Sequence, residues 1–154
     1  RLIRSSPFYT SIPSDATAIM EPGGVIEVAT RAICKEELEY SKKSGIEFIT
    51  SKQSPQKQPT KIAQEIKNKL SSCENVYLSI DMDVLDPAYA PGVQNPEPEG
   101  IQTHTLLDIL CSLCDKRIIG FDIVEVTPIY DSGLTAITAS KIILELLSQI
   151  EKGI

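Results

Sequence analysis

The sequence predicts an α/β fold, a three-layer α/β/α arrangement with a mainly parallel sheet at its centre. Short, almost continuous apolar runs alternate along the chain with longer segments in which apolar residues recur at helical spacing. Strands that are apolar on both faces are typical of parallel sheets covered by helices, because an uncovered face would carry polar residues at alternate positions. The length of 154 residues suits a single domain, 1–154, with its own core.

Strands and helices are expected in alternation along this domain. Residues 1–23 have no clear pattern, and their prolines predict loop with one short helix near Asp15–Met20. Gly45 is expected to close the first long helix, and Thr60 to cap the second. The expected strands are Val25–Thr30, Ile46–Thr50, Val76–Ile80 and Arg117–Val126. The expected helices are Lys35–Ser44, Thr60–Leu70, one capped by Thr103 or Thr105, and Leu134–Ile150.

Composition and charge exclude two classes of partner. The chain carries 15 Lys and Arg against 21 Asp and Glu, a net charge of −6, so it has no cationic excess to neutralise a phosphate backbone. No apolar run approaches the roughly 20 residues of a membrane span. We therefore expect neither a nucleic-acid partner nor a membrane partner.

The start of the chain and its cysteines indicate its origin and compartment. The chain opens on Arg1 without a Met and shows no apolar signal segment, so we expect a piece of a longer, cytoplasmic protein. Its four cysteines suit reduced thiols in that compartment. Cys111 and Cys114 form a C-x-x-C, but they lie in a helical apolar stripe without a second such pair or a His cluster. We interpret them as core residues rather than as a redox or metal pair.

Residues 76–100 carry the densest chemistry. This stretch begins as an apolar strand, presents Asp81, Asp83 and Asp86, and continues into a loop that holds four prolines. Ligands of open α/β sheets bind beyond the carboxyl ends of the strands, and side chains two apart on an extended segment share a face. Asp81 and Asp83 can therefore aim at one ion. Asp86, which stands beside Pro87, is expected to brace a turn.

A pair of aspartates that only braces a turn is the alternative interpretation of this D-x-D. These acids, however, directly follow a buried strand, where a charged carboxylate needs a counter-charge, a proton or a metal ion. A metal site is favoured on that ground, and carboxylate oxygens suit Mg²⁺, Ca²⁺ or Mn²⁺. An EF-hand is excluded, because Asp86 and Gly92 occupy the positions of its required Gly and Glu.

Three stretches resemble one family. Residues 79–92, SIDMDVLDPAYAPG, are similar to the signature of the ureohydrolases, the family of arginases and agmatinases, and the wording DPAYAPG is closer to agmatinases. Residues 122–128, DIVEVTP, resemble the family's D-[IV]-V-E-x-x-P strand end. Residues 26–40, from IEV through RA to KEELEY, resemble its E-V-G-[IV]-R-[AS] strand and the helix that follows. The resemblance covers roughly residues 25–150.

The resemblance implies a fold, a reaction and three site residues. The fold would be arginase-like, with this chain as its C-terminal half. The reaction would be hydrolysis of a guanidinium C–N bond to urea and an amine at a dinuclear Mn²⁺ site, with Asp81 and Asp83 as metal ligands and Glu125 holding the substrate's guanidinium. Paired ions can supply hydroxide at neutral pH, and a carboxylate can accept two parallel N–H bonds from a guanidinium. Similarity to agmatinases implies conversion of agmatine to putrescine in polyamine biosynthesis, and a trimer or hexamer as the complete protein.

The departures from the family's pattern are equally specific. The family takes its other four metal ligands from a G-G-D-H-type loop and a D-A-H-x-D strand end, and neither motif occurs in this chain. The only histidine, His104, stands where many members have Arg, and we expect it to face solvent in the first turn of a helix. Asp15 aligns with a His that shuttles protons in the family, and Ala29 replaces a Gly. The roles of Asp15 and His104 stay open.

We therefore expect an inactive chain with part of a site, whose longer parent is an agmatinase-like enzyme. The alternative is a non-catalytic fragment or paralogue that keeps the fold for assembly. A phosphotransferase of the haloacid dehalogenase type also begins its site with D-x-D, but it expects Thr or Val where Leu85 stands, and a later paired-acid motif. In a glycosyltransferase with a D-x-D motif, the proline-containing loop would have no role. Both rank below the ureohydrolase interpretation.

Overall fold

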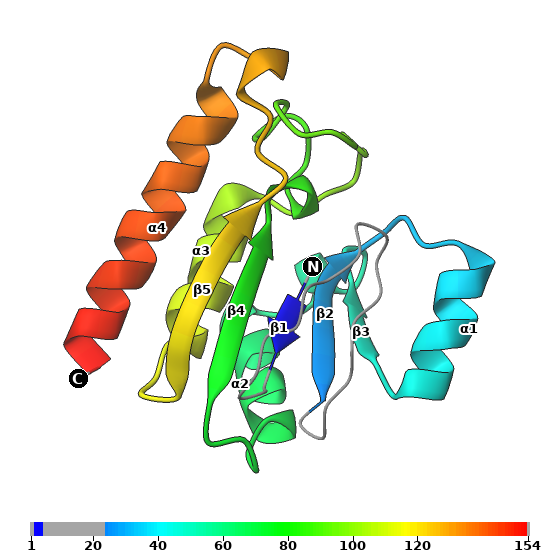
Figure 1. Cartoon of the computed structure of the whole chain (residues 1–154), viewed down its shortest axis with the longest axis vertical. Helices are drawn as coiled ribbons and strands as arrows, with labels where there is room; N and C mark the ends of the chain where they lie inside the picture. Colours follow the sequence, from blue (N-terminus) through cyan, green and yellow to red (C-terminus); the bar gives the residue numbers. More distant parts are fainter. Residues whose placement is uncertain (1, 5–23, 154) are drawn as a thin grey trace.

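The computed structural model describes residues 2–4 and 24–153. Strands and helices alternate through most of this part of the chain (Figure 1). The strands are β1 (Leu2–Arg4), β2 (Val25–Thr30), β3 (Glu47–Thr50), β4 (Val76–Asp81) and β5 (Ile118–Val124). The α-helices are α1 (Lys35–Ser44), α2 (Pro59–Lys69), α3 (Thr103–Leu113) and α4 (Leu134–Gly153). Three short 3₁₀ helices are η1 (Ser54–Gln56), η2 (Met82–Val84) and η3 (Pro128–Tyr130).

The strands form one five-stranded sheet in the order β3-β2-β1-β4-β5. The longer neighbours pair in parallel, β2 with β3 and β4 with β5, as the alternation of strands and helices predicts. Leu2–Arg4 lies between the two parallel pairs and is antiparallel to both β2 and β4. The prediction that this segment is loop was wrong, because a strand of only three residues is too short for a recognisable pattern. The expected helix near Asp15–Met20 falls outside the described residues.

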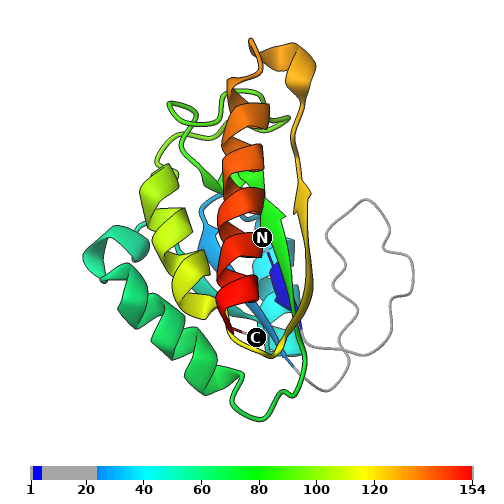
Figure 2. The same cartoon turned by 90° about the vertical axis from the view of Figure 1, so that its left-hand side faces the viewer.

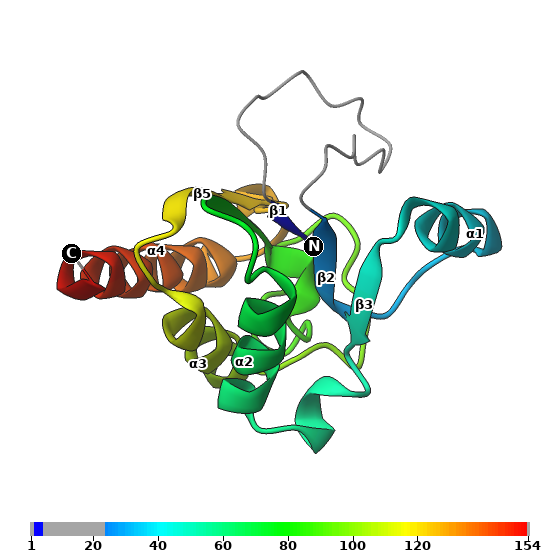
Figure 3. The same cartoon turned by 90° about the horizontal axis from the view of Figure 1, so that it is seen from below.

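Helices α2, α3 and α4 lie together on one face of the sheet, whereas α1 lies past its β3 end (Figures 2 and 3). One continuous core fills the space between the sheet and these three helices. Its fully buried side chains include Ile62, Leu78, Ile109 and Ile142. None of the described helices is long and apolar enough to cross a bilayer. The predicted α/β fold is confirmed, with its core between the sheet and α2, α3 and α4. The described helices cover one face of the sheet, so the second helical layer of the predicted three-layer arrangement stays a prediction (Figures 2 and 3).

The helix ends show which local signals were interpreted correctly. Gly45 closes α1 in the left-handed conformation, with φ of 68°, as predicted. Thr60 does not cap α2: the helix already begins at Pro59, whose ring fixes φ at a helical value in the first position. Neither threonine caps α3, because Gln102 occupies the cap position without a side-chain hydrogen bond.

The four cysteines, Cys34, Cys73, Cys111 and Cys114, are free in the structure. Cys114 packs against the main core, and burial raises the pKa of its thiol to about 11. Burial also raises the pKa of Cys111, which is half-buried. Because a thiolate is the reactive form, both groups stay protonated and unreactive near neutral pH. The core interpretation of the C-x-x-C is confirmed for Cys114.

Candidate functional site

Strand β4 delivers two aspartates to its carboxyl end. Asp81 is the last residue of the strand and is 4% exposed. Asp83 lies two residues further on, in η2, and its backbone N–H donates to Oδ1 of Asp81 over 3.1 Å. The two side chains were expected to share a face because the chain would be extended. That reason was wrong, since the strand ends at Asp81 and the 3₁₀ turn sets their relation.

A polar cavity of about 400 Å³ opens at this end of the sheet. It receives residues from four segments that are far apart in the sequence. They come from the end of β2 and the residues after it, from the end of β4 with η2, from the loop before α3, and from the residue after β5. The polar lining consists of Thr30, Arg31, Asp81, Asp83, Gln94, Asn95, Glu97 and Glu125. The three predicted site residues Asp81, Asp83 and Glu125 therefore face one space.

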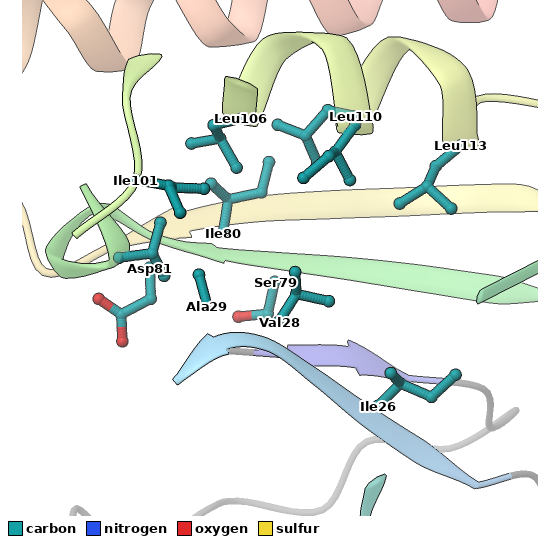
Figure 4. Close-up of a pocket in the computed structure, with 12 residues that line it drawn as sticks. Ile26, Val28, Ala29, Ser79, Ile80, Asp81, Ile101, Leu106, Leu110 and Leu113 are labelled. Carbon is teal, nitrogen blue, oxygen red and sulfur yellow. The ribbon is translucent and has the colours of Figure 1, made fainter. Parts of the chain in front are cut away.

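Asp81 also borders an apolar space on its other side. A small cavity of about 40 Å³ lies between the sheet and α3, lined by Ile80, Leu106 and Leu110 among others. Figure 4 shows the carboxylate of Asp81 pointing away from these apolar side chains. A carboxylate at such a boundary is desolvated on one flank, which favours a bound cation on the other. The buried position of Asp81 thus agrees with the ligand role predicted for it.

Glu125 enters the cavity through an unusual backbone conformation. It follows directly after β5 and has φ of 63°, in the left-handed region that non-glycine residues rarely adopt. Its side chain is half-buried and lines the polar cavity. Backbone strain of this kind persists where the surroundings hold a residue in place, and it clusters at functional sites. Asp122, three residues earlier, instead accepts hydrogen bonds from Ser79 (2.7 Å) and Tyr77 (3.2 Å) and joins β5 to β4.

Ala29, which also lines the cavity, shows a second left-handed conformation. Its φ is 63°, it is 1% exposed, and the pairing of β2 with β3 shifts register between Val28 and Thr30. An extra residue in one strand bends that strand locally. The bend brings Thr30 and Arg31 to the cavity wall. Ala29 stands where the resembling family has Gly, and its positive φ gives the physical reason for a glycine there.

Arg31 is a residue of the site to which the sequence analysis assigned no role. Its guanidinium donates from Nε and Nη2 to the carbonyl of Glu97, over 3.0 and 2.7 Å. Nη2 also donates to the carbonyl of Asp83, and to that of Leu85 over 3.4 Å. The planar, fixed fork of an arginine suits this contact with several acceptors. Arg31 therefore ties the segment that carries Asp83 to the far end of the loop before α3.

The loop of residues 86–100 is closed at its base by backbone contacts. The N–H of Asp86 donates to the carbonyl of Ile101, and the N–H of Ile101 to that of Val84, both over 3.0 Å. A Cβ at Gly100 would lie 2.2 Å from the backbone nitrogen of Asp86, so only glycine fits there. The carboxylate of Asp86 accepts from the N–H of Ala88 over 3.0 Å. The prediction that Asp86 braces a turn is confirmed.

A second anchor fixes the middle of this loop to the start of α4. The N–H of Gly92 donates to Oγ1 of Thr135 over 2.7 Å, and Thr135 is fully buried. Asp131 accepts from the hydroxyl of Thr135 over 2.7 Å and from the N–H groups of Thr135 and Gly133, both over 2.8 Å. These bonds, that of the Thr135 hydroxyl first, hold the pKa of Asp131 below its usual value.

The remaining candidates lie away from the cavity or outside the description. His104 is exposed in the first turn of α3, as predicted. Asp15 belongs to the residues that the structure does not describe. In the described ranges, no three or more His, Cys, Asp or Glu side chains gather closely enough to hold a metal ion. The ligand roles of Asp81 and Asp83 and the guanidinium role of Glu125 stay predictions.

Sequence comparison identifies the family. A family model described as the arginase family matches residues 2–148, nearly the whole chain. The chain belongs to the arginase family. Among curated arginase-family relatives, it is 33% identical to proclavaminate amidinohydrolase of Streptomyces clavuligerus over 88% of this chain and 44% of that protein. It is 38% identical to the agmatinase of Halalkalibacterium halodurans, over 86% of this chain and 44% of the agmatinase.

Solved structures of the arginase family agree with the fold. The arginase from Bacillus subtilis matches with a TM-score of 0.75 at 34% identity, over 79% of this chain and 44% of the arginase. The recognition of the ureohydrolase family and its α/β fold are thus confirmed. The chain spans less than half the length of these relatives.

Proposed function

We propose that this chain contributes one wall of the active site of a ureohydrolase that cleaves a guanidinium C–N bond to give urea and an amine. The observation that carries this proposal is the convergence of Asp81, Asp83 and Glu125 on one polar cavity. These residues come from the ends of two neighbouring parallel strands, where α/β sheets bind their ligands.

The proposed metal ligands fit part of a binding site for a hard cation. Asp81 and Asp83 offer carboxylate oxygens to the same space, and such oxygens suit Mn²⁺. The described residues supply no cluster of three or more ligands, so this chain alone does not complete a site for two ions. Two bound Mn²⁺ ions would lower the pKa of a water molecule and make hydroxide accessible at neutral pH. The other ligands belong, in this proposal, to the part of the relatives that the chain does not span.

The chain's own residues bind and orient in this proposal. Glu125 accepts two parallel N–H bonds from the planar guanidinium, which fixes the direction of its central carbon. In this proposal, the surroundings that keep Glu125 in its left-handed conformation also hold its carboxylate in the cavity before the substrate arrives. Arg31 acts on the substrate only indirectly, by holding the segment of Asp83 in place.

The proposed substrate is agmatine, with putrescine as the amine product, and the proposed setting is polyamine biosynthesis in the cytoplasm. The DPAYAPG segment supports this choice over arginine. The relatives include an agmatinase, a mitochondrial arginase and proclavaminate amidinohydrolase, so guanidinium hydrolysis is the shared theme of their names. We also propose a trimer or hexamer for the complete protein.

A Mn²⁺ titration of the chain by calorimetry tests the ligand roles. We expect weak binding that disappears in the double variant Asp81→Asn, Asp83→Asn, because the amides keep the shape but lose the charge that attracts the cation. Asp86→Asn is the matched control, since Asp86 follows in the same motif but braces a turn outside the cavity lining. Binding that survives the double variant, or that is lost equally in the control, contradicts these roles.

The second candidate function is a non-catalytic chain that keeps the fold for assembly. Two observations favour it: the described residues complete no metal cluster, and the only histidine of the chain faces solvent. The same titration discriminates, because a chain without ligand function shows no Mn²⁺ binding that depends on Asp81 and Asp83.

A further inference from the structure

Glu125 stands in a short turn that is fixed at both ends. Before it, Val124 ends β5 and is paired with Asp81 in β4. After it, the backbone N–H of Thr127 donates to the carbonyl of Gly92 over 2.7 Å. Glu125, with φ of 63°, and one further residue lie between these two fixed points. The bond from Thr127 therefore limits the directions that the side chain of Glu125 can take.

Gly92 is itself held by two side chains at the start of α4. Its N–H donates to Oγ1 of Thr135, and the hydroxyl of Thr135 donates to Oδ2 of Asp131, both over 2.7 Å. An ionised carboxylate only accepts hydrogen bonds, so the hydroxyl must donate to Asp131 and accept from Gly92. Thr135 is fully buried, where water cannot replace a lost partner. Asp131 and Thr135 together therefore fix the backbone of Gly92.

Asp131 also contacts Gly92 directly. A Cβ at position 92 would lie 2.7 Å from Cγ of Asp131 and 2.8 and 2.9 Å from its two carboxylate oxygens, so the carboxylate packs against the glycine. The N–H groups of Gly133 and Thr135 donate to the same carboxylate, each over 2.8 Å. These donors lie at the start of α4, whose Ile142 is fully buried in the core. Asp131 therefore fixes the backbone at Gly92 relative to a helix that is anchored in the core.

The left-handed conformation of Glu125 needs support of this kind. A non-glycine residue keeps such a φ only where the surrounding structure over-determines it. The loop that carries Gly92 is already closed at its base by the hydrogen bond from Asp86 to Ile101. The bond from Thr127 to Gly92 is therefore not needed to close the loop. It adds a fixed position for the residues that follow Glu125.

We propose that Asp131 and Thr135 are positioning residues for Glu125 and act on it through Gly92 and Thr127. The described lining of the polar cavity includes Glu125 but neither Asp131 nor Thr135, so the two act from outside it. The proposal rests on the proposed function, in which the carboxylate of Glu125 holds the guanidinium. Its direction matters there, because a misplacement of about 1 Å in an active site can slow a reaction about 100-fold.

NMR spectroscopy of the isotopically labelled chain tests the proposal. The three-bond coupling between the amide and α protons of Glu125 reports its φ, and hydrogen exchange at Thr127 reports its bond to Gly92. Thr135→Val removes the hydroxyl, and Asp131→Asn leaves one acceptor oxygen where the carboxylate has two. We expect both variants to shift the coupling of Glu125 toward that of extended backbone and to speed exchange at Thr127 at least about tenfold. Thr135→Ser, which keeps the hydroxyl, should restore the coupling and the exchange rate of the unsubstituted chain.

Thr138→Val is the matched control, because it is the same substitution on the same helix. The hydroxyl of Thr138 donates to the carbonyl of Leu134 within α4, over 3.0 Å, and we expect its loss to leave both readouts at Glu125 and Thr127 unchanged. If Thr135→Val does not fold, Asp131→Asn decides, since Asp131 is only partly buried.

A purely structural role of the two residues would lower the free energy of unfolding and leave the coupling of Glu125 as it is. That result overturns the proposal. An equal shift of the coupling in Thr138→Val, or a failure of Thr135→Ser to restore it, also overturns the proposal. The readouts need neither metal nor substrate, so their failure is distinguishable from failure of the proposed function, which the Mn²⁺ titration tests.

Discussion

In the part of the chain that the structure describes, three non-glycine residues have left-handed backbone conformations, and they differ in what the side chain contributes. Glu125 places a carboxylate in the cavity, Ala29 is buried, and Glu99 is exposed in the loop before α3. The left-handed conformation costs a non-glycine residue about 1–2 kcal/mol. For Ala29, a change to glycine would relieve this strain but remove a buried methyl group worth about 0.8 kcal/mol and add unfolded-state entropy. These terms nearly cancel, which explains why alanine is tolerated at this position.

Glu99 allows the effect of a left-handed backbone conformation on stability to be measured by itself, because its side chain makes only an exposed ion pair with Lys52 at 3.8 Å. We expect Glu99→Gly to stabilise the fold by about 0.5–1 kcal/mol in urea denaturation, since the strain relieved exceeds the entropy gained by the unfolded chain. Glu97→Gly in the same loop is the matched comparison, because Glu97 has no positive φ, and it should destabilise by about 0.5–1 kcal/mol. Equal effects of the two changes would show that φ does not decide the outcome.

Arg31 gives a second prediction at the residue scale. Arg31→Ala removes donors from the carbonyls of Asp83, Leu85 and Glu97, and we expect it to destabilise the fold by about 1–3 kcal/mol. Arg31→Lys should rescue only part of this, because an ammonium group does not span the acceptors as a fork does. Faster hydrogen exchange in 86–101 is the measurement that reports the loop directly.

The control for Arg31 is Lys52→Ala, which removes a cation that reaches the same loop from solvent. The Lys52–Glu99 pair is 79% and 74% exposed, so its loss should change stability by less than about 0.5 kcal/mol and leave loop exchange unaltered. If both variants speed up hydrogen exchange in the loop equally, then the loss of a positive charge accounts for the effect. That result would contradict a specific role for the guanidinium of Arg31.

At the scale of the elements, Arg117, just before β5, pairs with Asp115 and links this turn to the C-terminal end of α2. Arg117 donates from Nε and Nη2 to the carboxylate of Asp115, over 3.0 and 2.9 Å, and from Nη1 to the carbonyl of Leu70, over 2.7 Å. The hydrogen bond from Arg117 is the main cause that lowers the pKa of Asp115 to about 2. The folded state therefore favours the ionised carboxylate more than the unfolded chain does.

The sign of this shift predicts a pH dependence. Because the folded pKa lies below the unfolded one, the stabilisation is fully present above about pH 4 and is lost as the pH falls toward about 2. We expect Asp115→Asn to lower the free energy of unfolding by about 1–2 kcal/mol at pH 7, a range that allows for screening at a partly exposed pair. This difference from the unsubstituted chain should shrink below about pH 4. Urea denaturation across this range measures it. Glu39→Gln, which breaks an exposed pair with Lys35, should change little at any pH.

The elements with a long apolar pattern were predictable from sequence, and those set by tertiary contacts were not. Val25–Thr30 and Lys35–Ser44 match their predicted bounds, because each lies between strong turn or cap signals. The strand Leu2–Arg4 was missed, since it is defined by its two neighbours rather than by its own three residues. The cap of α1 was also missed: Cys34 accepts from the N–H of Glu37 over 3.4 Å, a role that serine or aspartate usually fills.

The residues of the candidate site also differ in whether the sequence alone could predict them. Asp81 and Glu125 stand at the carboxyl ends of apolar strands, and their convergence results from the parallel pairing that the alternation of strands and helices predicts. The contacts of Arg31 were not predictable, because its acceptors are backbone carbonyls from two ends of a loop and carry no sequence signal. Gln94 and Asn95 line the cavity from a loop whose base closes tightly where Gly100 meets Asp86, a long-range contact that the local sequence does not predict.

At the scale of the whole molecule, the site and the surface lead to the same conclusion. The cavity has carboxylates but no complete ligand cluster among the described residues, and the β5 end of the sheet is apolar and open. Both features fit the proposal that this chain forms one part of a larger domain. The length of the relatives agrees, since the chain spans less than half of each that was compared in detail.

Urea release from agmatine with added Mn²⁺ tests this account most directly. It is measured for the chain alone and for the chain fused to the unmatched portion of the Halalkalibacterium halodurans agmatinase. The third sample is that fusion carrying Asp81→Asn. We expect no turnover by the chain alone, turnover by the fusion, and a loss of at least about 100-fold with Asp81→Asn, because a metal ligand and its charge are removed. Clear turnover by the 154-residue chain alone, or a fusion whose activity is indifferent to Asp81→Asn, would contradict the central claim that this chain carries one part of a ureohydrolase site.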